Sequence, residues 1–399
     1  MFGHRTQEAV RRLENGADRA ELELPGVTAA VIDATFEVER GEIFVVMGLS
    51  GSGKSTLLRT LNGLLPATAG RVLVDEADLT TMTAAQIREL RQRRMSMVFQ
   101  HFALFPHRTV AENVEYGLRV QGVDRSHRRT RAAEALHLVG LTGWEDRLPA
   151  QLSGGMQQRV GLARALAADT EVLLMDEAFS ALDPLIRKEM QDQLLLLQAR
   201  LGKTIVFITH DLNEAMRLGD RIAMMRDGRI VQVGTAQQIL TAPADDYVSN
   251  FIRDVDRARV LTAGAAMAYP HTTITPSVEP AGALDIMRRG GEAVLFAVDG
   301  AGRLEGTVTE AAAQAAADQG VTDVRGIIER SVQQVGAATL AGELFEAAAT
   351  SDFPIAVVGE SRKLLGVVTR ESLLRALAPP PQAATESTGR DIPEVSANA

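Results

Sequence analysis

The 399-residue sequence has no cysteine, few aromatic residues and no long apolar run. A chain without cysteine forms no disulfide and offers no thiolate metal ligand, which fits a reducing compartment. Its apolar stretches all fall short of the roughly 20 residues that a membrane-spanning helix needs, so we expect no membrane span. Acidic residues outnumber basic ones, and the net charge of −9 argues against a general nucleic-acid-binding protein, which needs a basic surface.

The length and the 46% apolar content predict a folded protein of two or more domains. Short apolar runs typical of buried parallel strands occupy 42–47, 172–175 and 204–208. A helical pattern over 185–201 separates the last two, so strands and helices alternate and predict an α/β domain with a largely parallel sheet. Ahead of these runs, residues 4–26 predict an amphipathic charged helix, and the alternation over 27–38 predicts a strand.

Residues 297–309 and 356–369 are two copies of one pattern, aligned by Gly306 and Gly366. Helical patterns flank each copy, so the repeated unit is predicted to be helix, hairpin, helix. The proline-led polar stretch after residue 378 predicts a disordered tail. The predicted divisions are a first domain at 1–240, a linker at 241–264, repeat domains at 265–322 and 323–378, and the tail at 379–399.

A glycine-rich stretch follows the predicted strand that ends at Met47. The residues Gly48-Leu49-Ser50-Gly51-Ser52-Gly53-Lys54-Ser55-Thr56 fit the pattern G-x-x-x-x-G-K-[ST] and open a helical run. Glycines let backbone N–H groups turn inward around a phosphate, and the helix N-terminus adds positive dipole. We expect Lys54 to reach the terminal phosphates and Ser55 to ligate magnesium; the alternative is a glycine-rich turn without a ligand.

Two acidic residues, Asp176 and Glu177, come directly after the apolar run at 172–175. Such a pair is commonly just the exposed end of a strand. Beside a phosphate loop, however, Asp176 is suited to hold magnesium through water, and Glu177 to polarise an attacking water as a general base.

Five motifs occur in one order along the first 240 residues. They are the phosphate loop 48–56, LSGGMQQR at 152–159, the acidic pair 176–177, SALD at 180–183 and THD at 209–211. This set resembles the ATP-binding cassette (ABC) ATPases. The resemblance implies ATP and Mg²⁺ as cofactors and a head-to-tail dimer with a second copy of the chain, each ATP lying between the phosphate loop of one copy and Ser153-Gly154-Gly155 of the other.

The resemblance also implies roles for single residues. Gln100 looks like the glutamine that contacts magnesium and water, Asp183 like the aspartate that crosses the dimer, and His210 like the switch histidine at the γ-phosphate, in place of a merely structural histidine. The implied nucleotide contacts are Phe2, Gly48, Ser50, Gly51, Ser52, Gly53, Lys54, Ser55, Thr56, Gln100, Ser153, Gly154, Gly155, Gln157, Asp176, Asp183 and His210. The implied catalytic residues are Glu177, His210, Gln100 and Lys54, and the implied metal site comprises Ser55, Gln100 and Asp176.

Further segments narrow the resemblance. Residues 97–110 and 244–256, the insertion at 4–26 and the C-terminal repeat are similar to the ATPases of glycine betaine/proline betaine importers, and the repeat resembles a pair of CBS domains. This implies an ATP-hydrolysing subunit at the cytoplasmic face of the membrane, bound to a permease beside 100–105 and served by a substrate-binding protein. The osmolyte itself is not expected to touch this chain, because one Trp and three Tyr are too scattered for a cation–π cage.

The sequence departs from this family at two places. The usual first strand, which leads to an aromatic that stacks on adenine, is missing; Phe2-Gly3 matches only its end, so either the chain start is truncated or the domain edge is incomplete. In the first case Phe2 is the adenine platform. In the repeat, Ala312 and Ser372 stand where ligand-binding CBS domains have an acid for the ribose, which favours a structural or ionic-strength-sensing module over an adenosine site.

Three other functions compete with this prediction. One is an importer ATPase for choline, carnitine or ectoine. Another is a soluble cassette ATPase that acts on nucleic acid or ribosomes, although a single cassette with an acidic balance argues against it. The third is a nucleotide-sensing regulatory protein, which the intact Glu177 and His210 disfavour.

Overall fold

The computed structural model describes residues 1–17, 22, 26–100, 102–269, 272–351 and 353–378. They form two compact units: unit 1 covers Met1–Val255, and unit 2 begins at Asp256. The boundary falls inside the predicted linker 241–264, much of which is helical and belongs to unit 1. The domain limits expected from the sequence stay a prediction, and the predicted tail lies outside the described residues.

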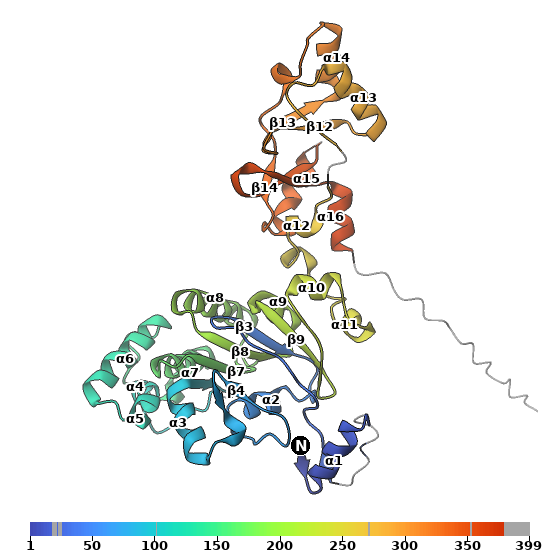
Figure 1. Cartoon of the computed structure of the whole chain (residues 1–399). Coiled ribbons are helices and arrows are strands. Elements are labelled where there is room, and N and C mark those ends of the chain that lie inside the picture. The colour runs from blue at the N-terminus through green and yellow to red at the C-terminus, as the bar shows by residue number, and fades with distance from the viewer. Residues whose placement is uncertain (18–21, 23–25, 101, 270–271, 352, 379–399) are drawn as a thin grey trace, which may run out of the picture. The chain divides into compact units, whose positions relative to one another are not determined.

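A six-stranded sheet forms the centre of unit 1 (Figure 1). Its strands, in spatial order, are β10 (Arg229–Gly234), β9 (Arg221–Arg226), β3 (Ile43–Met47), β8 (Thr204–Thr209), β7 (Val172–Asp176) and β6 (Met95–Val98). All neighbours are parallel except β10 and β9, which confirms the predicted largely parallel sheet. Every residue of β3 is buried, as expected for an apolar strand covered on both faces.

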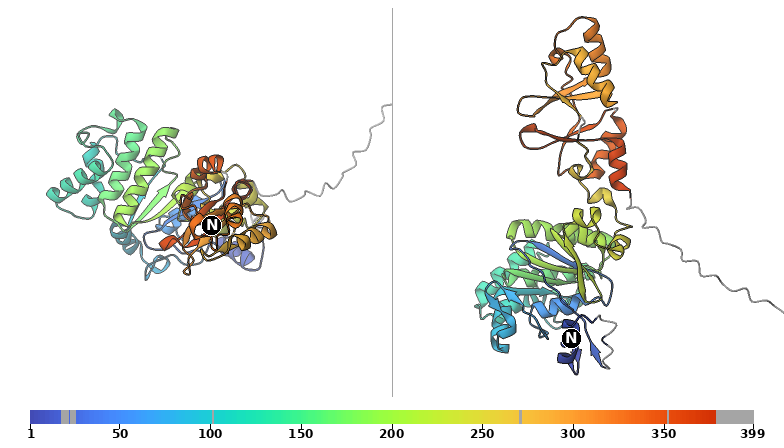
Figure 2. Two further views of the ribbon diagram at one scale, coloured as in Figure 1. Left: turned by 90° about the horizontal axis from the view of Figure 1, so that it is seen from above. Right: turned by 45° about the vertical axis from the view of Figure 1, so that its right-hand side comes forward.

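The helices of unit 1 are α1 (Thr6–Glu14), α2 (Lys54–Leu61), α3 (Ala84–Arg94), α4 (Val110–Val114), α5 (Tyr116–Val120), α6 (Arg125–Leu138), α7 (Gly154–Ala167), α8 (Pro184–Leu201), α9 (Leu212–Leu218), α10 (Ala236–Thr241) and α11 (Asp246–Phe251). The helix α2 packs on β7 and β8, and α9 packs on β3. The helices α4, α5 and α6 gather around α7, beyond β6 (Figure 2). Within the described residues, no helix combines the length and apolarity needed to cross a membrane.

Local sequence explains why α8 matches its predicted span. Asp183 caps the helix by accepting hydrogen bonds from two backbone N–H groups, and Pro184 occupies the first turn. The helix ends at Gly202, whose φ of 60° is the left-handed conformation that glycine tolerates.

Two predictions near the N-terminus are wrong in extent. The helix expected over 4–26 is described only as α1, which ends before Asn15 and Gly16; part of the remainder lies outside the described residues. The strand expected over 27–38 is reduced to β2 (Val27–Thr28), which pairs with β1 (Phe2–Gly3). The residues that follow pack partly buried apolar side chains on the sheet, with the Phe36 ring 5.0 Å from that of Phe44, but they form no strand with any part of the chain that the structure describes. Unit 1 also holds the short pair β4 (Leu73–Val74) and β5 (Ala77–Asp78).

Unit 2 has the predicted order of helix, hairpin and helix, twice. Its elements are α12 (Ala263–Ala266), β11 (Thr273–Ile274), α13 (Pro280–Gly290), β12 (Val294–Val298), β13 (Leu304–Thr309), α14 (Glu310–Asp318), β14 (Gln334–Gly336), the 3-10 helix η6 (Ala341–Leu344), α15 (Phe345–Thr350), β15 (Ile355–Val358), β16 (Leu364–Val368) and α16 (Arg370–Leu377). Each hairpin forms a three-stranded sheet with a parallel third strand, and each has a register shift at its bulge, at Ala297/Val298 and at Val357/Val358.

The two repeats interlock through their glycines. A side-chain carbon at Gly306 would lie 2.3 Å from the Glu329 carbonyl oxygen, and one at Gly366 would lie 2.9 Å from the Ala268 carbonyl oxygen. Thr307 bridges to Glu329. The hairpin of each repeat is therefore clamped by the segment that leads into the other repeat.

Candidate functional site

The phosphate loop joins β3 to α2 and is shaped by close backbone contacts. A Cβ at Gly48, whose φ is 153°, would lie 2.1 Å from the Met225 carbonyl oxygen, and a Cβ at Gly53, whose φ is 100°, would lie 2.1 Å from the Ala30 carbonyl oxygen. Only glycine fits both positions, because any side chain would collide with backbone that cannot move aside. The loop is thus pressed against the end of β9 and against the segment after β2.

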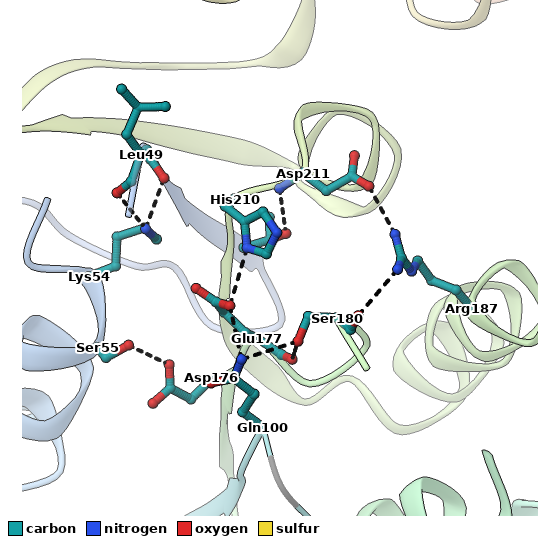
Figure 3. Close-up of polar contacts among 12 residues, drawn as sticks. Leu49, Lys54, Ser55, Gln100, Asp176, Glu177, Ser180, Arg187, His210 and Asp211 are labelled. Carbon is teal, nitrogen blue, oxygen red and sulfur yellow. Dashed lines mark hydrogen bonds and ion pairs between the residues drawn. The ribbon is translucent and has the colours of Figure 1, made fainter. Parts of the chain in front are cut away.

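Lys54 lies in the mouth of this loop with 4% of its surface exposed. Its ammonium donates to the carbonyl oxygens of Gly48 at 2.8 Å and Leu49 at 3.0 Å (Figure 3). Burial lowers the pKa of Lys54, and the negative charges of Glu177 and Asp176 oppose that shift. The Ser52 hydroxyl is also buried, and it has no hydrogen-bond partner among the described residues. A buried cation and an unpaired hydroxyl at a helix N-terminus fit a phosphate group.

Ser55 and Asp176 meet beside the loop, as the sequence predicts for a metal site. The Ser55 hydroxyl donates to Asp176 Oδ1 at 2.8 Å, and the guanidinium of Arg59 lies 3.8 Å from the other carboxylate oxygen. Asp176 ends β7 and is 5% exposed. A hydroxyl and a buried carboxylate are hard oxygen donors of the kind Mg²⁺ prefers, so the residues fit this ion together with phosphate oxygens.

Three predicted catalytic residues also converge. Glu177 Oε2 lies 3.2 Å from Nδ1 of His210 and accepts from the amide of Gln100 at 3.4 Å (Figure 3). Glu177 has a φ of 46°, rare for a residue with a side chain, and its N–H donates to the Ile208 carbonyl of β8 at 3.0 Å. This turn at the end of β7 aims the carboxylate at His210. The Ser180 hydroxyl supports it by donating to the Glu177 carbonyl at 2.9 Å.

Arg187 connects the turn that holds Ser180 to the segment that holds Asp211, and no sequence motif predicted it. Its guanidinium donates to the carbonyls of Ser180 at 3.3 Å and Leu182 at 3.1 Å and pairs with the Asp211 carboxylate at 3.3 Å. Asp211 follows His210 and caps α9 through its other oxygen. The only available sequence signal was position, since Arg187 lies one helical turn after Asp183.

The LSGG motif opens α7. The Ser153 hydroxyl caps this helix by accepting from the Met156 N–H at 3.3 Å, and a Cβ at Gly155 would lie 2.8 Å from the Ile186 side chain. Among the described residues, no hydrogen bond or ion pair joins Ser153, Gly154 or Gly155 to the phosphate loop. Gln157, expected at the nucleotide, donates its amide to the carbonyls of Pro149 and Leu152 and so closes the loop before α7.

The remaining predicted contacts are placed as follows. Asp183 uses its carboxylate to cap α8. Phe2 lies in β1 with 44% of its surface exposed and pairs with Thr28, two residues before the carbonyl that touches the phosphate loop. Its role as adenine platform stays a prediction.

The segment after Gln100 carries two more left-handed residues, Phe102 and Ala103, with φ of 56° and 46°. Arg164 of α7 holds their carbonyls at 2.8 Å and 2.7 Å, and burial lowers the pKa of this guanidinium. Phe105 packs against Tyr116, with ring centroids 4.6 Å apart. The segment is therefore fastened to the helices around α7.

Comparison with known proteins places this geometry in a family. A family described as ABC transporter matches residues 31–180. The glycine betaine transport ATP-binding protein OpuAA of Bacillus subtilis (strain 168) is 51% identical over 95% of this chain and 90% of that protein. The glycine betaine/carnitine transport ATP-binding protein GbuA of Listeria monocytogenes serotype 1/2a (strain 10403S) is 48% identical over 95% of each. The trimethylamine N-oxide transport system ATP-binding protein TmoW of Ruegeria pomeroyi (strain ATCC 700808 / DSM 15171 / DSS-3) is 50% identical over 66% of this chain and 78% of that protein. The chain therefore belongs to the family of ATP-binding proteins of glycine betaine ABC transporters.

Proposed function

We propose that this chain is the ATP-hydrolysing subunit of an ABC importer that powers uptake of glycine betaine or proline betaine through a membrane permease, at the cytoplasmic face of the membrane. The observation that carries the proposal is the meeting of Glu177, His210 and Gln100 beside a complete phosphate loop, in a chain 51% identical to OpuAA over 95% of its length. These groups match the chemistry of γ-phosphate hydrolysis.

Each residue of the site has its own part in ATP hydrolysis. The backbone N–H groups of 48–56 cradle the phosphates of ATP, and Lys54 exchanges its two carbonyl partners for phosphate oxygens. Ser55 and Asp176 would hold Mg²⁺, which would neutralise charge on the phosphates. Glu177 takes up the proton of the attacking water, while His210 and Gln100 hold that water in line with the γ-phosphate.

The LSGG motif supports a head-to-tail dimer of two copies of the chain. Ser153 and Gly154 begin α7 on the surface, and a Cβ at Gly154 would meet nothing within 4 Å. A helix N-terminus with free space before it is suited to a γ-phosphate that comes from outside the chain. Closure of the dimer then drives the permease, which docks beside residues 100–105.

We infer that unit 2 is a CBS pair that regulates the ATPase without binding adenosine. The Thr309 hydroxyl caps α14, and the Thr369 hydroxyl caps α16. Ala312 and Ser372, at the position of the ribose-binding acid, are also the residues whose N–H groups those hydroxyls accept. Neither position therefore carries a carboxylate for a ribose.

The cassette does not determine which solute is transported. TmoW is 50% identical over 66% of the chain, although it is named as part of a transport system for trimethylamine N-oxide. Similarity of the cassette alone therefore does not distinguish betaine from related solutes. The match to OpuAA over 95% of the chain, unit 2 included, favours betaine. The carnitine in the name of GbuA makes carnitine the second candidate.

The test is reconstitution of the complete transporter in vesicles. Betaine uptake should require ATP and be lost in a Glu177→Gln control, and uptake of carnitine, choline, ectoine and trimethylamine N-oxide should be weaker. Deletion of residues 265–399 should keep ATP hydrolysis and change its dependence on salt. ATP-independent uptake, or equal uptake of all solutes, would contradict the proposal.

A further inference from the structure

The short helix α11 is the last helix of unit 1 before the chain enters unit 2. Val248 and Ile252 are fully buried, so α11 is fixed in unit 1 rather than free as a linker. The turn before it is held by Gln232 of β10, whose side-chain amide donates to the Ala242 carbonyl at 2.9 Å and accepts from the Ala244 N–H at 2.9 Å. Three residues after Ile252 the chain reaches Val255, the end of unit 1.

Tyr247 of α11 reaches from this helix to the end of β9, beside the phosphate loop. Its hydroxyl donates to the Met225 carbonyl at 3.5 Å, and the neighbouring Leu49 backbone acts on the phenol to lower its pKa. The ring is fixed from two sides, by the Arg226 guanidinium 4.9 Å from its centroid and by Phe251, whose ring centroid is 5.8 Å away. Burial raises the pKa of Tyr247, which keeps the hydroxyl neutral and able to donate and accept at once.

The partner of this hydroxyl belongs to the wall of the ATP site. The Met225 carbonyl is the group that excludes a side chain at Gly48. The carbonyl of the next loop residue, Leu49, accepts from Lys54. When Lys54 turns to a phosphate, Leu49 loses that contact, and the Met225 carbonyl, held by the Tyr247 hydroxyl, still backs the loop at Gly48. The first turn of the loop is then positioned from α11.

We propose that Tyr247 is a positioning residue for the phosphate loop and that α11 is the element through which unit 2 acts on ATP binding. A shift of the chain at Val255 moves a helix that carries a hydrogen bond to the Met225 carbonyl, against which the phosphate loop packs. The second half of this proposal rests on the proposed regulatory role of unit 2. The first half needs only the contacts within unit 1.

The first experiment separates positioning from stability in the full chain. Tyr247→Phe removes only the hydroxyl and keeps the ring between Arg226 and Phe251, and Tyr269→Phe is the matched control because Tyr269 is 80% exposed. The loss of one hydrogen bond should raise KM for ATP about three- to tenfold in Tyr247→Phe with kcat little changed. Hydrogen exchange of the backbone amides in the phosphate loop should accelerate in the same variant. An unchanged KM, or a fall in kcat alone, would overturn the positioning role.

The second experiment tests the route from unit 2 in the complex with its permease, reconstituted in vesicles at several ionic strengths. One variant carries Tyr247→Phe, and another a six-residue Gly-Ser insertion between Val255 and Asp256, which lets unit 2 move without moving α11. Both should lose the wild-type dependence of KM for ATP on ionic strength, and combining them should add nothing further. A wild-type dependence that persists in Tyr247→Phe would overturn the route. Absence of any dependence in the wild type would contradict the regulatory role of unit 2, while the KM comparison still decides the positioning role.

Discussion

Arg187 offers a sharp test of how the loops of the ATP site are held together. Arg187→Met keeps much of the aliphatic stem and removes the guanidinium that contacts the carbonyls of Ser180 and Leu182 and the carboxylate of Asp211. Both carbonyls lie in the turn before α8, and Asp211 directly follows His210. The substitution should therefore loosen two catalytic loops with one change.

The size of the effect follows from these contacts. The ion pair with Asp211 is partly open to solvent, with side-chain exposures of 28% and 33%, so it contributes about 0.5–1 kcal/mol. Each hydrogen bond from a charged donor to a carbonyl contributes about 1 kcal/mol at these distances. Together they predict a loss of about 2–3 kcal/mol in the free energy of unfolding. For a unit as large as unit 1 this corresponds to a fall in Tm of about 4–12 °C.

Thermal unfolding of the full chain, with the unit 1 transition identified by its shift with ATP, measures this loss. Lys188→Met on the exposed side of the same helix is the control, and Arg187→Lys should be intermediate because it keeps the charge but not the fork. A double-mutant cycle with Asp211→Asn, which preserves the cap on α9, should give a coupling of about 0.5–1 kcal/mol. The kcat for ATP should also fall, about tenfold, with little change in KM. An Arg187→Met protein with the Tm and kcat of the control would refute the reasoning.

Three further predictions concern other parts of the chain. Glu177→Gln should lower kcat for ATP by about 10²- to 10⁴-fold, because the amide cannot accept the proton of the attacking water. ATP binding, measured by titration, should be retained. Rapid hydrolysis in this variant would exclude Glu177 as the base. Burial raises the pKa of Glu214, so the folded state binds its proton more tightly than the unfolded state, and stability should fall as pH rises from the unfolded value of 4.5 through the raised folded value. Glu214→Gln can still accept from Gln191 and should therefore gain Tm over the wild type increasingly across that window, whereas a pH-independent difference would contradict the shift. Gly306→Ala should destabilise unit 2 by about 2–3 kcal/mol and Gly366→Ala by about 1–2 kcal/mol, because the new Cβ would lie 2.3 Å from the Glu329 carbonyl oxygen in the first variant and 2.9 Å from the Ala268 carbonyl oxygen in the second. An unchanged unit 2 transition in either variant would contradict the close contact at that glycine.

Local sequence was enough to predict a chemistry for the site. The phosphate loop, the acidic pair at 176–177 and the cap at Asp183 are each defined within a few residues, because glycine conformation, strand termination and helix capping act over that range. The apolar runs at 172–175 and 204–208 predicted β7 and β8 nearly residue for residue. The repeat in unit 2 was visible from the equal spacing of Gly306 to Gly366 and of Thr309 to Thr369, and the two hairpins have the same bulge.

Local alternation was not enough where pairing depends on a neighbour. The apolar pattern after Thr28 predicts a strand, but whether a strand forms is decided by the presence of a free sheet edge beside it, and these residues instead pack their side chains on the sheet.

Only the tertiary structure decided which distant groups meet. Glu177 lies 33 residues from His210 and 77 from Gln100, and they converge because β7 and β8 are parallel and in register, with Asp176 opposite Ile208. The contacts of Arg187 with Asp211 and of Tyr247 with the Met225 carbonyl depend likewise on how the helices pack on that sheet. Sequence by itself therefore determined which groups are present and in what order, whereas strand register and helix packing, which sum many weak long-range contacts, decided which of them act on one another.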